Sequence, residues 1–212
     1  MRIVQNLLEL LKTAGETTPL ARVVDVAGGG HEGKVNTSDL GAFNVPLTKI
    51  RPHLISMHTL ALESLADHAP NVSFVHDFPG AVYTYLHRGV GGALGWVVYI
   101  VLEMMHAVLG RWLFVPIEES GERHVYLATS GRYGPRNGKR MGVTQEESQV
   151  LAGSNGEFGS GVYSVGWNCE GPAERAVVAL KELRANGVKK LVWDHMTTEF
   201  DRISGAGGTK PA

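Results

Sequence analysis

The sequence predicts an α/β fold in which helices cover both faces of a short parallel sheet. Strand-like apolar runs at residues 21–27 and 71–78 alternate with helix-like stretches at residues 2–14 and 52–68. Helix–strand–helix–strand order is typical of parallel strands joined by right-handed crossovers. The chain has 212 residues, of which 43% are hydrophobic. A chain of this length and composition buries one substantial core, so a single domain is expected.

The first predicted helix, residues 2–14, is amphipathic rather than a secretory signal. Its apolar residues share one face, namely Ile3, Val4, Leu7, Leu8 and Leu11. A signal peptide would have a continuous apolar stretch followed by small residues at a cleavage site. The single cysteine, Cys169, permits no intrachain disulfide, which fits a reducing compartment. We therefore expect a cytoplasmic protein.

The second predicted helix begins at Pro52, because proline favours the first position of a helix. Apolar residues follow at helical spacing, namely Leu54, Met57, Ala61 and Leu65. In the strand before this helix, Asp25 lies among valines. A carboxylate in a buried strand needs a partner, so we expect Asp25 to be buried and paired.

Residues 85–115 form an unusually apolar region. Between Arg88 and Arg111 only Glu103 and His106 are ionisable. The region is predicted to be a buried helical pair or a helical lid over an apolar substrate. A transmembrane helix is less favoured, because Glu103 and His106 would lie in the middle of the bilayer. A helix lying on a membrane surface is an equally unfavoured alternative.

The remaining elements are placed by turn signals and apolar spacing. They are a helix at 117–129, an exposed loop at 131–142, a strand at 159–167, and two helices within 172–204. One domain is therefore expected at 1–204, followed by a disordered tail at 205–212.

Charge and histidine distribution argue against two classes of ligand. The net charge is −1, whereas phosphate backbones are bound by clustered lysine and arginine, so no nucleic-acid partner is expected. The nine histidines are scattered, and the sequence contains neither HExxH nor a paired Cys/His cluster. We therefore expect no metal site.

A glycine-rich run at residues 28–33 matches the pattern GxGxxG after a predicted strand. A dinucleotide site also needs a helix directly afterwards, because the helix N-terminus holds the pyrophosphate. Residues 34–46 instead have the composition of a loop. The run is therefore predicted to be a turn that needs positive φ or close backbone packing.

Several segments carry a family resemblance. They are RVVDVAGG at 22–29, TLALESLA at 59–66, VSFVHDFPGAVYT at 72–84, ESGERHVYLATS at 119–130, GVYSVGW at 161–167 and KKLVWDHMTTEF at 189–200. Together they resemble the C-terminal half of the short-chain dehydrogenase/reductase family. More narrowly, they resemble a divergent fungal subgroup often encoded near secondary-metabolite genes. The resemblance implies a partial Rossmann-like, three-layer domain that is truncated at the N-terminus.

The resemblance also implies that two catalytic residues of the family are missing. The family's serine follows its fifth strand, and the matching position here is Gly28. Its tyrosine lies four residues before a lysine. If Lys49 is that lysine, the tyrosine position holds Val45, or Pro46 with a shift of one. A lysine alone does not replace the phenolic acid whose pKa it lowers.

The nicotinamide side of the family's site is represented here by Pro79, Gly80 and Thr84, as vestigial cofactor contacts. The family's glycine-rich cofactor loop lies far upstream of these segments, and Met1 falls where the family has its fourth helix. We therefore expect no cofactor, and NAD(P) only if an upstream half exists. Family dimers commonly pack through the fourth and fifth helices, so a homodimer is expected.

Candidate catalytic residues are those expected at the carboxyl ends of the strands, where parallel sheets gather ligands. They are His31, Lys49, His53 and Asp77. Lys49 and His53 share a helix face if the helix extends back past its proline. A histidine beside a carboxylate can act as general base, and Lys49 can polarise a carbonyl. The expected substrate contacts are Gly28, Tyr83, Trp96 and Tyr99.

Only one of His76 and Asp77 can face this cleft, because neighbouring side chains of a strand alternate between its faces. The following Pro-Gly turn favours Asp77. Glu118, Glu119, Glu122 and His124 have the pattern of a charged helix face.

Three functional hypotheses remain open. The first is an enzyme that acts on a small apolar carbonyl metabolite by cofactor-independent isomerisation, dehydration or cyclisation. The second is a C-terminal fragment of an NAD(P)-dependent oxidoreductase. The third is a non-catalytic partner of a full-length homologue, because a short sheet exposes an edge strand that recruits partners.

Overall fold

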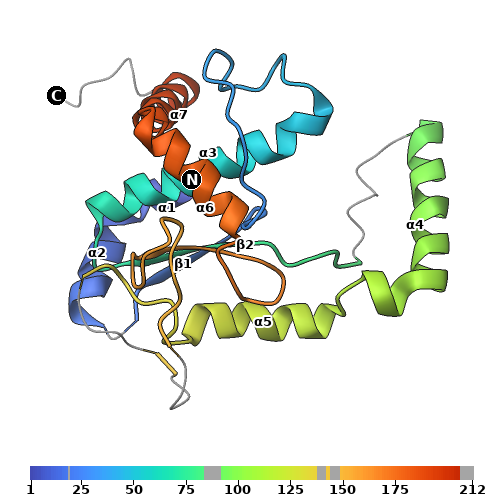
Figure 1. Ribbon diagram of the computed structural model, residues 1–212, viewed down its shortest axis with the longest axis horizontal. Coiled ribbons are helices and arrows are strands. Elements are labelled where there is room, and N and C mark those ends of the chain that lie inside the picture. The colour runs from blue at the N-terminus through green and yellow to red at the C-terminus, as the bar shows by residue number, and fades with distance from the viewer. Residues whose placement is uncertain (19, 84–91, 138–141, 144–148, 206–212) are drawn as a thin grey trace.

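The computed structural model describes residues 1–18, 20–83, 92–137, 142–143 and 149–205 (Figure 1). Within these residues the chain is an α/β structure built on a three-stranded sheet. Thr84, which the sequence assigns to a cofactor contact, lies outside the described residues, as do positions 85–91 of the predicted apolar region.

The sheet is parallel throughout, in the order β1-β2-β3. Its strands are β1 (Arg22–Val26), β2 (Ser73–Asp77) and β3 (Val162–Val165). Every residue of the central strand β2 is buried. Cover on both faces of the sheet accounts for this burial, which includes the polar side chains of Ser73, His76 and Asp77.

Helices cover the two faces of the sheet unequally. They are α1 (Arg2–Asn6), α2 (Leu8–Thr17), α3 (Leu47–His68), α4 (Gly92–Leu113), α5 (Ile117–Thr129), α6 (Glu174–Ala185) and α7 (Val188–Ser204). Figure 1 shows α3, α6 and α7 above the sheet and α5 below it. The predicted parallel α/β architecture is therefore confirmed for the described residues.

The core lies on both sides of β2. Phe74 packs with Leu62 and Leu65 of α3 on one side. Val75 packs with Leu127 of α5 on the other side. Neighbouring side chains of β2 thus point to opposite faces of the sheet and pack in two different apolar layers.

Helix α3 begins five residues earlier than predicted, at Leu47 rather than Pro52. Pro52 lies in the second turn, where its missing N–H removes one hydrogen bond without ending the helix. The first predicted helix is interrupted instead, at Leu7 between α1 and α2. The early start of α3 places Lys49 and His53 one turn apart on the same helix.

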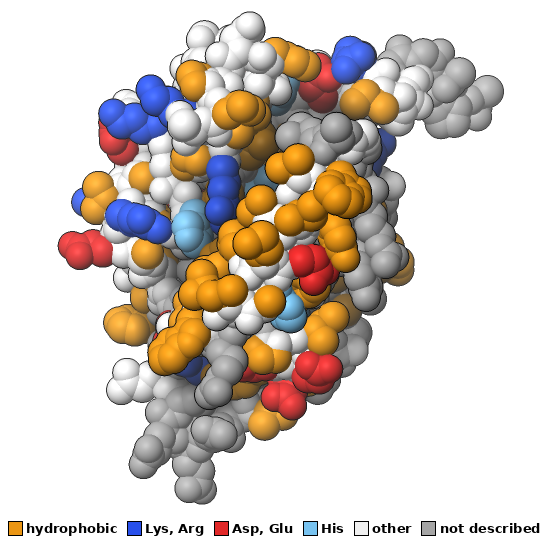
Figure 2. All heavy atoms as spheres, turned by 90° about the vertical axis from the view of Figure 1, so that its right-hand side faces the viewer, with side chains coloured by type: hydrophobic (Ala, Val, Ile, Leu, Met, Phe, Trp, Pro, Cys, Tyr) orange, Lys and Arg blue, Asp and Glu red, His pale blue; other side chains and the backbone are white. Residues whose placement is uncertain are grey.

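Helix α4 stands away from the sheet, at the right of Figure 1. Its side chains include Trp96, 69% exposed, and Trp112, 88% exposed. Figure 2 views the molecule from this side and shows hydrophobic side chains gathered across the face. The described part of the predicted region 85–115 is therefore one exposed helix rather than a buried pair. No helix among the described residues is long and apolar enough to cross a bilayer.

Candidate functional site

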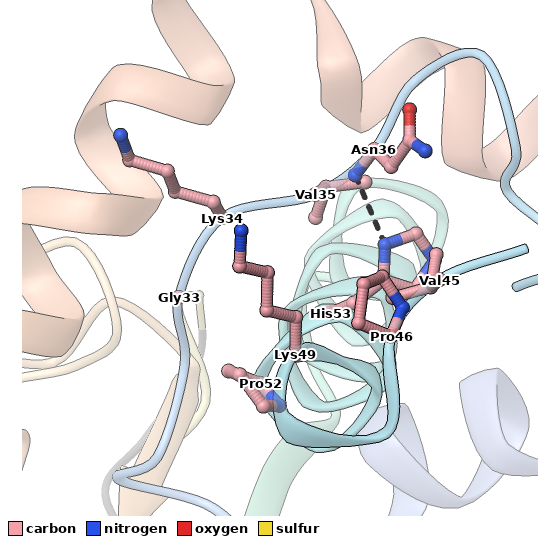
Figure 3. A pocket seen from close by; sticks show the side chains of 9 residues that line it. All are labelled: Gly33, Lys34, Val35, Asn36, Val45, Pro46, Lys49, Pro52 and His53. Carbon is pink, nitrogen blue, oxygen red and sulfur yellow. Dashed lines mark hydrogen bonds between the residues drawn. The ribbon is translucent and has the colours of Figure 1, made fainter.

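A pocket of about 480 Å³ lies between the loop after β1 and the first turns of α3 (Figure 3). This volume is within the range of small-molecule sites. The lining residues are Gly33, Lys34, Val35, Asn36, Val45, Pro46, Lys49, Pro52 and His53. The lining therefore combines apolar side chains with two lysines and one imidazole.

Hydrogen bonds within the loop and to α3 hold the loop that forms one wall of this pocket. The Asp39 carboxylate accepts bonds from the backbone N–H groups of Phe43 (3.1 Å) and Asn44 (2.6 Å). Gly33 N–H donates to Ser56 Oγ (2.8 Å), and Ser56 Oγ donates back to Gly33 O (2.7 Å). An aspartate that bonds the backbone after it is typical of a turn, here over residues 39–44. Ser56 fastens the start of the loop, at Gly33, to α3.

His53 holds the loop with both ring nitrogens. The backbone N–H of Asn36 donates to Nδ1 at 3.0 Å, so the ring proton lies on Nε2, which faces Leu40 O at 3.3 Å. The His53 side chain is buried. In this arrangement the imidazole has no nitrogen left for a substrate, and we infer that it positions the loop.

Replacing His53 with leucine should loosen the wall of the pocket without unfolding the domain. The variant removes the acceptor of the Asn36 N–H, so hydrogen exchange of that amide should become at least about tenfold faster. Amide exchange followed by NMR measures this rate. An unchanged Asn36 rate in a folded variant would contradict the positioning role.

Of the two lysines of the lining, Lys49 is the one that extends across the pocket, whereas the Lys34 side chain points away from it in Figure 3. The Lys49 side chain is exposed, and Figure 3 shows it extending across the opening toward the loop at Gly33 and Lys34. Within the described part of the chain, its ammonium group has no ion-pair partner. A lysine cation beside apolar walls is suited to donate a hydrogen bond to a carbonyl oxygen.

Asp77 lies on the other face of the sheet, against α5. Its Oδ2 is 3.1 Å from His124 Nε2, while His124 Nδ1 is 2.6 Å from Ser120 O. Burial raises the pKa of the Asp77 carboxyl to about 6, and His124 acts in the opposite direction. Asp77 is therefore paired with His124 and is not part of the pocket lining. The sequence pattern places His124 on a charged helix face and does not predict its contact with Asp77.

The other predicted site residues lie in three further places: the turn after β1, the segment after β2, and α4 with Tyr83 beside it. His31 and Gly28 lie in the turn after β1, where His31 packs edge-on against the Phe78 ring at 4.5 Å between centroids. Gly28 N–H donates to Asp77 O at 2.9 Å. Gly80 has a φ of 83° and follows Pro79 in the segment after β2.

Of the predicted substrate contacts, Trp96 and Tyr99 lie on α4, and Tyr83 contacts residues of that helix. The Tyr83 hydroxyl donates to the Glu103 carboxylate, and its ring stacks on His106 at 4.2 Å between centroids. Trp96 and Tyr99 are exposed on α4. The structure thus brings Lys49 and His53 together in one pocket and places the other candidates elsewhere.

Comparison with known proteins gives fungal oxidoreductases as relatives. The chain is 35% identical over 206 residues to oxidoreductase AN1596 of Emericella nidulans, covering 95% of this chain and 59% of that protein. It is 31% identical to oxidoreductase andH of Emericella variicolor, covering 97% and 59%. It is also 31% identical to the NmrA-like family domain-containing oxidoreductase notO of an Aspergillus species, covering 100% and 57%.

The chain therefore spans less than two thirds of the length of these curated relatives. No family model matches the sequence. No solved structure matches it. These findings bear out a relationship to fungal oxidoreductases. The finer assignment to the short-chain dehydrogenase/reductase family stays a prediction.

Proposed function

We propose that this chain forms the substrate-binding part of a fungal oxidoreductase and that the pocket beside Lys49 binds a small apolar carbonyl compound. The observation that carries this proposal is the position of the Lys49 ammonium in a pocket of about 480 Å³ with walls that include Val35, Val45 and Pro46. The names of the relatives supply the reaction class.

The pocket supports an apolar ligand that carries one polar oxygen. Hydrophobic walls bind the hydrocarbon part, and a single well-placed polar group fixes its orientation. Lys49 N–H donation to the carbonyl oxygen withdraws electron density from the carbonyl carbon. That polarisation favours addition of a nucleophile to the carbonyl carbon. Carbonyl reductions share this step, because hydride adds to that carbon.

A nicotinamide dinucleotide does not fit the described glycine-rich turn. A Cβ at Gly29 would lie 2.0 Å from His76 O, so the backbone of β2 already occupies the space beside this turn. The next helix, α3, begins only at Leu47, so its N-terminus does not follow the turn directly. In this proposal, a nicotinamide would be held by residues outside the present sequence.

Cofactor-independent isomerisation, dehydration or cyclisation remains the second hypothesis for the same pocket. Such reactions need a general base within reach of the substrate. His53 is the imidazole of the lining, and its two nitrogens already contact the backbone at Asn36 and Leu40. The geometry therefore favours substrate binding and carbonyl polarisation by Lys49 over acid–base chemistry by His53.

Replacing Lys49 with methionine should weaken binding of an apolar ketone such as 2-decanone about 10- to 100-fold. A hydrogen bond from a charged group contributes about 1.5–3 kcal/mol, and about 1.4 kcal/mol corresponds to a factor of ten. Isothermal titration calorimetry measures the Kd. The matched control is Lys181→Met on the exposed side of α6, which should bind the ketone like the original chain. Equal ketone affinity in the Lys49→Met variant would contradict the proposal.

A further inference from the structure

Three potential metal ligands converge between the sheet and α3, away from the proposed substrate pocket. They are Asp25 of β1, His58 of α3 and His76 of β2, and one ligand atom from each lies within 4.8 Å of the other two. Asp25 and His76 are paired neighbours in the parallel register. His58 Nδ1 is 3.0 Å from Asp25 Oδ2. The fold thus joins three residues that are far apart in the sequence.

His76 has an available lone pair in a fully buried position. Its Nδ1 lies 2.8 Å from Thr59 Oγ1, and Thr59 donates its hydroxyl proton to Glu32 Oε1 at 2.7 Å. Because that proton is already used, the ring proton of His76 lies on Nδ1, and Nε2 carries the lone pair. His76 Nε2 is buried and has no hydrogen-bond partner in the part of the chain that the structure describes.

A buried ring nitrogen without a partner calls for an explanation, because such groups are normally satisfied. The contacts of Nδ1 match the surroundings of a metal-binding histidine, whose second nitrogen usually donates to an oxygen that fixes the ring. Here that oxygen is Thr59 Oγ1, which Glu32 holds in turn. Ser164 Oγ also donates to the Glu32 carboxylate, so the group behind the ring is itself fixed.

We propose that Asp25, His58 and His76 bind one divalent transition-metal ion, with Zn²⁺ as the best match. Two imidazoles and one carboxylate are ligands that Zn²⁺ accepts, and three protein ligands leave a fourth position for water. Bonds of about 2.0–2.2 Å place the ligand atoms of a tetrahedral site roughly 3.3 Å apart. The ligand atoms now lie within 4.8 Å of one another, so they would draw closer together around a bound ion.

The cluster also has a route for the ion. The side chains of His58 and Asp25 are 39% and 25% exposed, whereas His76 forms the buried end of the site. An ion can therefore enter past His58 and Asp25 and reach the imidazole of His76. Because the ligands come from β1, β2 and α3, binding would cross-link the sheet to its main helix and stabilise the folded state.

The test uses the untagged full chain after dialysis against a chelator, titrated with Zn²⁺ by calorimetry and with Co²⁺ by visible absorption. One Zn²⁺ per chain, a higher Tm with Zn²⁺ and the absorption of tetrahedral Co²⁺ are expected. His58→Ala should weaken Zn²⁺ binding at least about 100-fold, since even loss of a residue behind a ligand costs 10- to 100-fold. His58 is partly exposed, so this variant should keep the fold even where His76→Gln does not.

The matched control is His68→Ala, which changes an exposed histidine of the same helix and should leave Zn²⁺ affinity unchanged. Absence of Zn²⁺ binding to the original chain would overturn the proposal. Equal Zn²⁺ affinity in the folded His58→Ala variant would overturn it as well, because the ion would then be held by other groups.

Discussion

Replacing Gly29 with alanine is expected to destabilise the fold by at least about 3 kcal/mol. The added Cβ would lie 2.0 Å from His76 O and 2.9 Å from Val165 O, which belong to the backbones of two neighbouring strands. Neither strand can move without disturbing the sheet, so the cost is at the upper end for an overpacked site. Urea unfolding followed by circular dichroism measures the free energy of unfolding.

The control for this experiment is Gly121→Ala in α5. A Cβ at Gly121 meets no atom within 4 Å, so alanine should stabilise the protein by up to about 1 kcal/mol through its higher helix propensity. Equal stability of the Gly29→Ala variant and the original chain would contradict the close approach of this turn to β2 and β3. It would also reopen the glycine-rich turn as a space for a ligand.

Replacing Phe74 with alanine should cost about 3–5 kcal/mol, because it opens a cavity at the centre of the sheet. Phe74 is fully buried in β2 and packs with Leu62, Leu65 and Val162. The same unfolding experiment measures the loss. Phe43→Ala is the matched control, since Phe43 is 90% exposed and its removal should change the stability by less than about 0.5 kcal/mol. Similar losses in both variants would place the core elsewhere.

The sequence predicts the architecture well because the pattern and the packing agree. The apolar runs around Val24 and Val75 are parallel strands, as the helix–strand–helix–strand order predicts. The prediction of a turn that needs positive φ or close backbone packing is also confirmed. Gly28 and Gly30 have φ of 121° and 80°, and Gly29 packs against β2. Positive φ and close packing of the backbone therefore account for these glycines, and a bound dinucleotide is not needed to explain them.

Helix boundaries were harder to predict, because local preferences compete with tertiary contacts. Pro52 is typical of a helix start, yet α3 continues back to Leu47. The loop before α3 is fastened to it by Ser56 and His53, and these contacts cannot be read from local spacing. The exposure of α4 is also a tertiary property, because its apolar composition alone predicts burial. A lid role for α4 and a homodimer remain predictions.

The candidate site was predictable only where its residues are close in sequence. The four-residue spacing of Lys49 and His53 predicts their common helix face. The choice between His76 and Asp77 depends on which helix covers which face of the sheet. In the structure Asp77 meets His124 of α5, whereas His76 meets Thr59 of α3. These contacts join residues that are far apart in the sequence, so no sequence motif predicts them.

The most direct test of the proposed function is a map of where an apolar ketone binds. Two-dimensional ¹H–¹⁵N NMR of the full chain during titration with 2-decanone reports every backbone amide and tryptophan indole. Shifts are predicted at Lys34, Val35, Asn36 and Lys49, around the pocket of Figure 3, and they should be lost in the Lys49→Met variant. Shifts confined to the indoles of Trp96 and Trp112 would contradict the account, because the ketone would then bind α4 rather than the pocket.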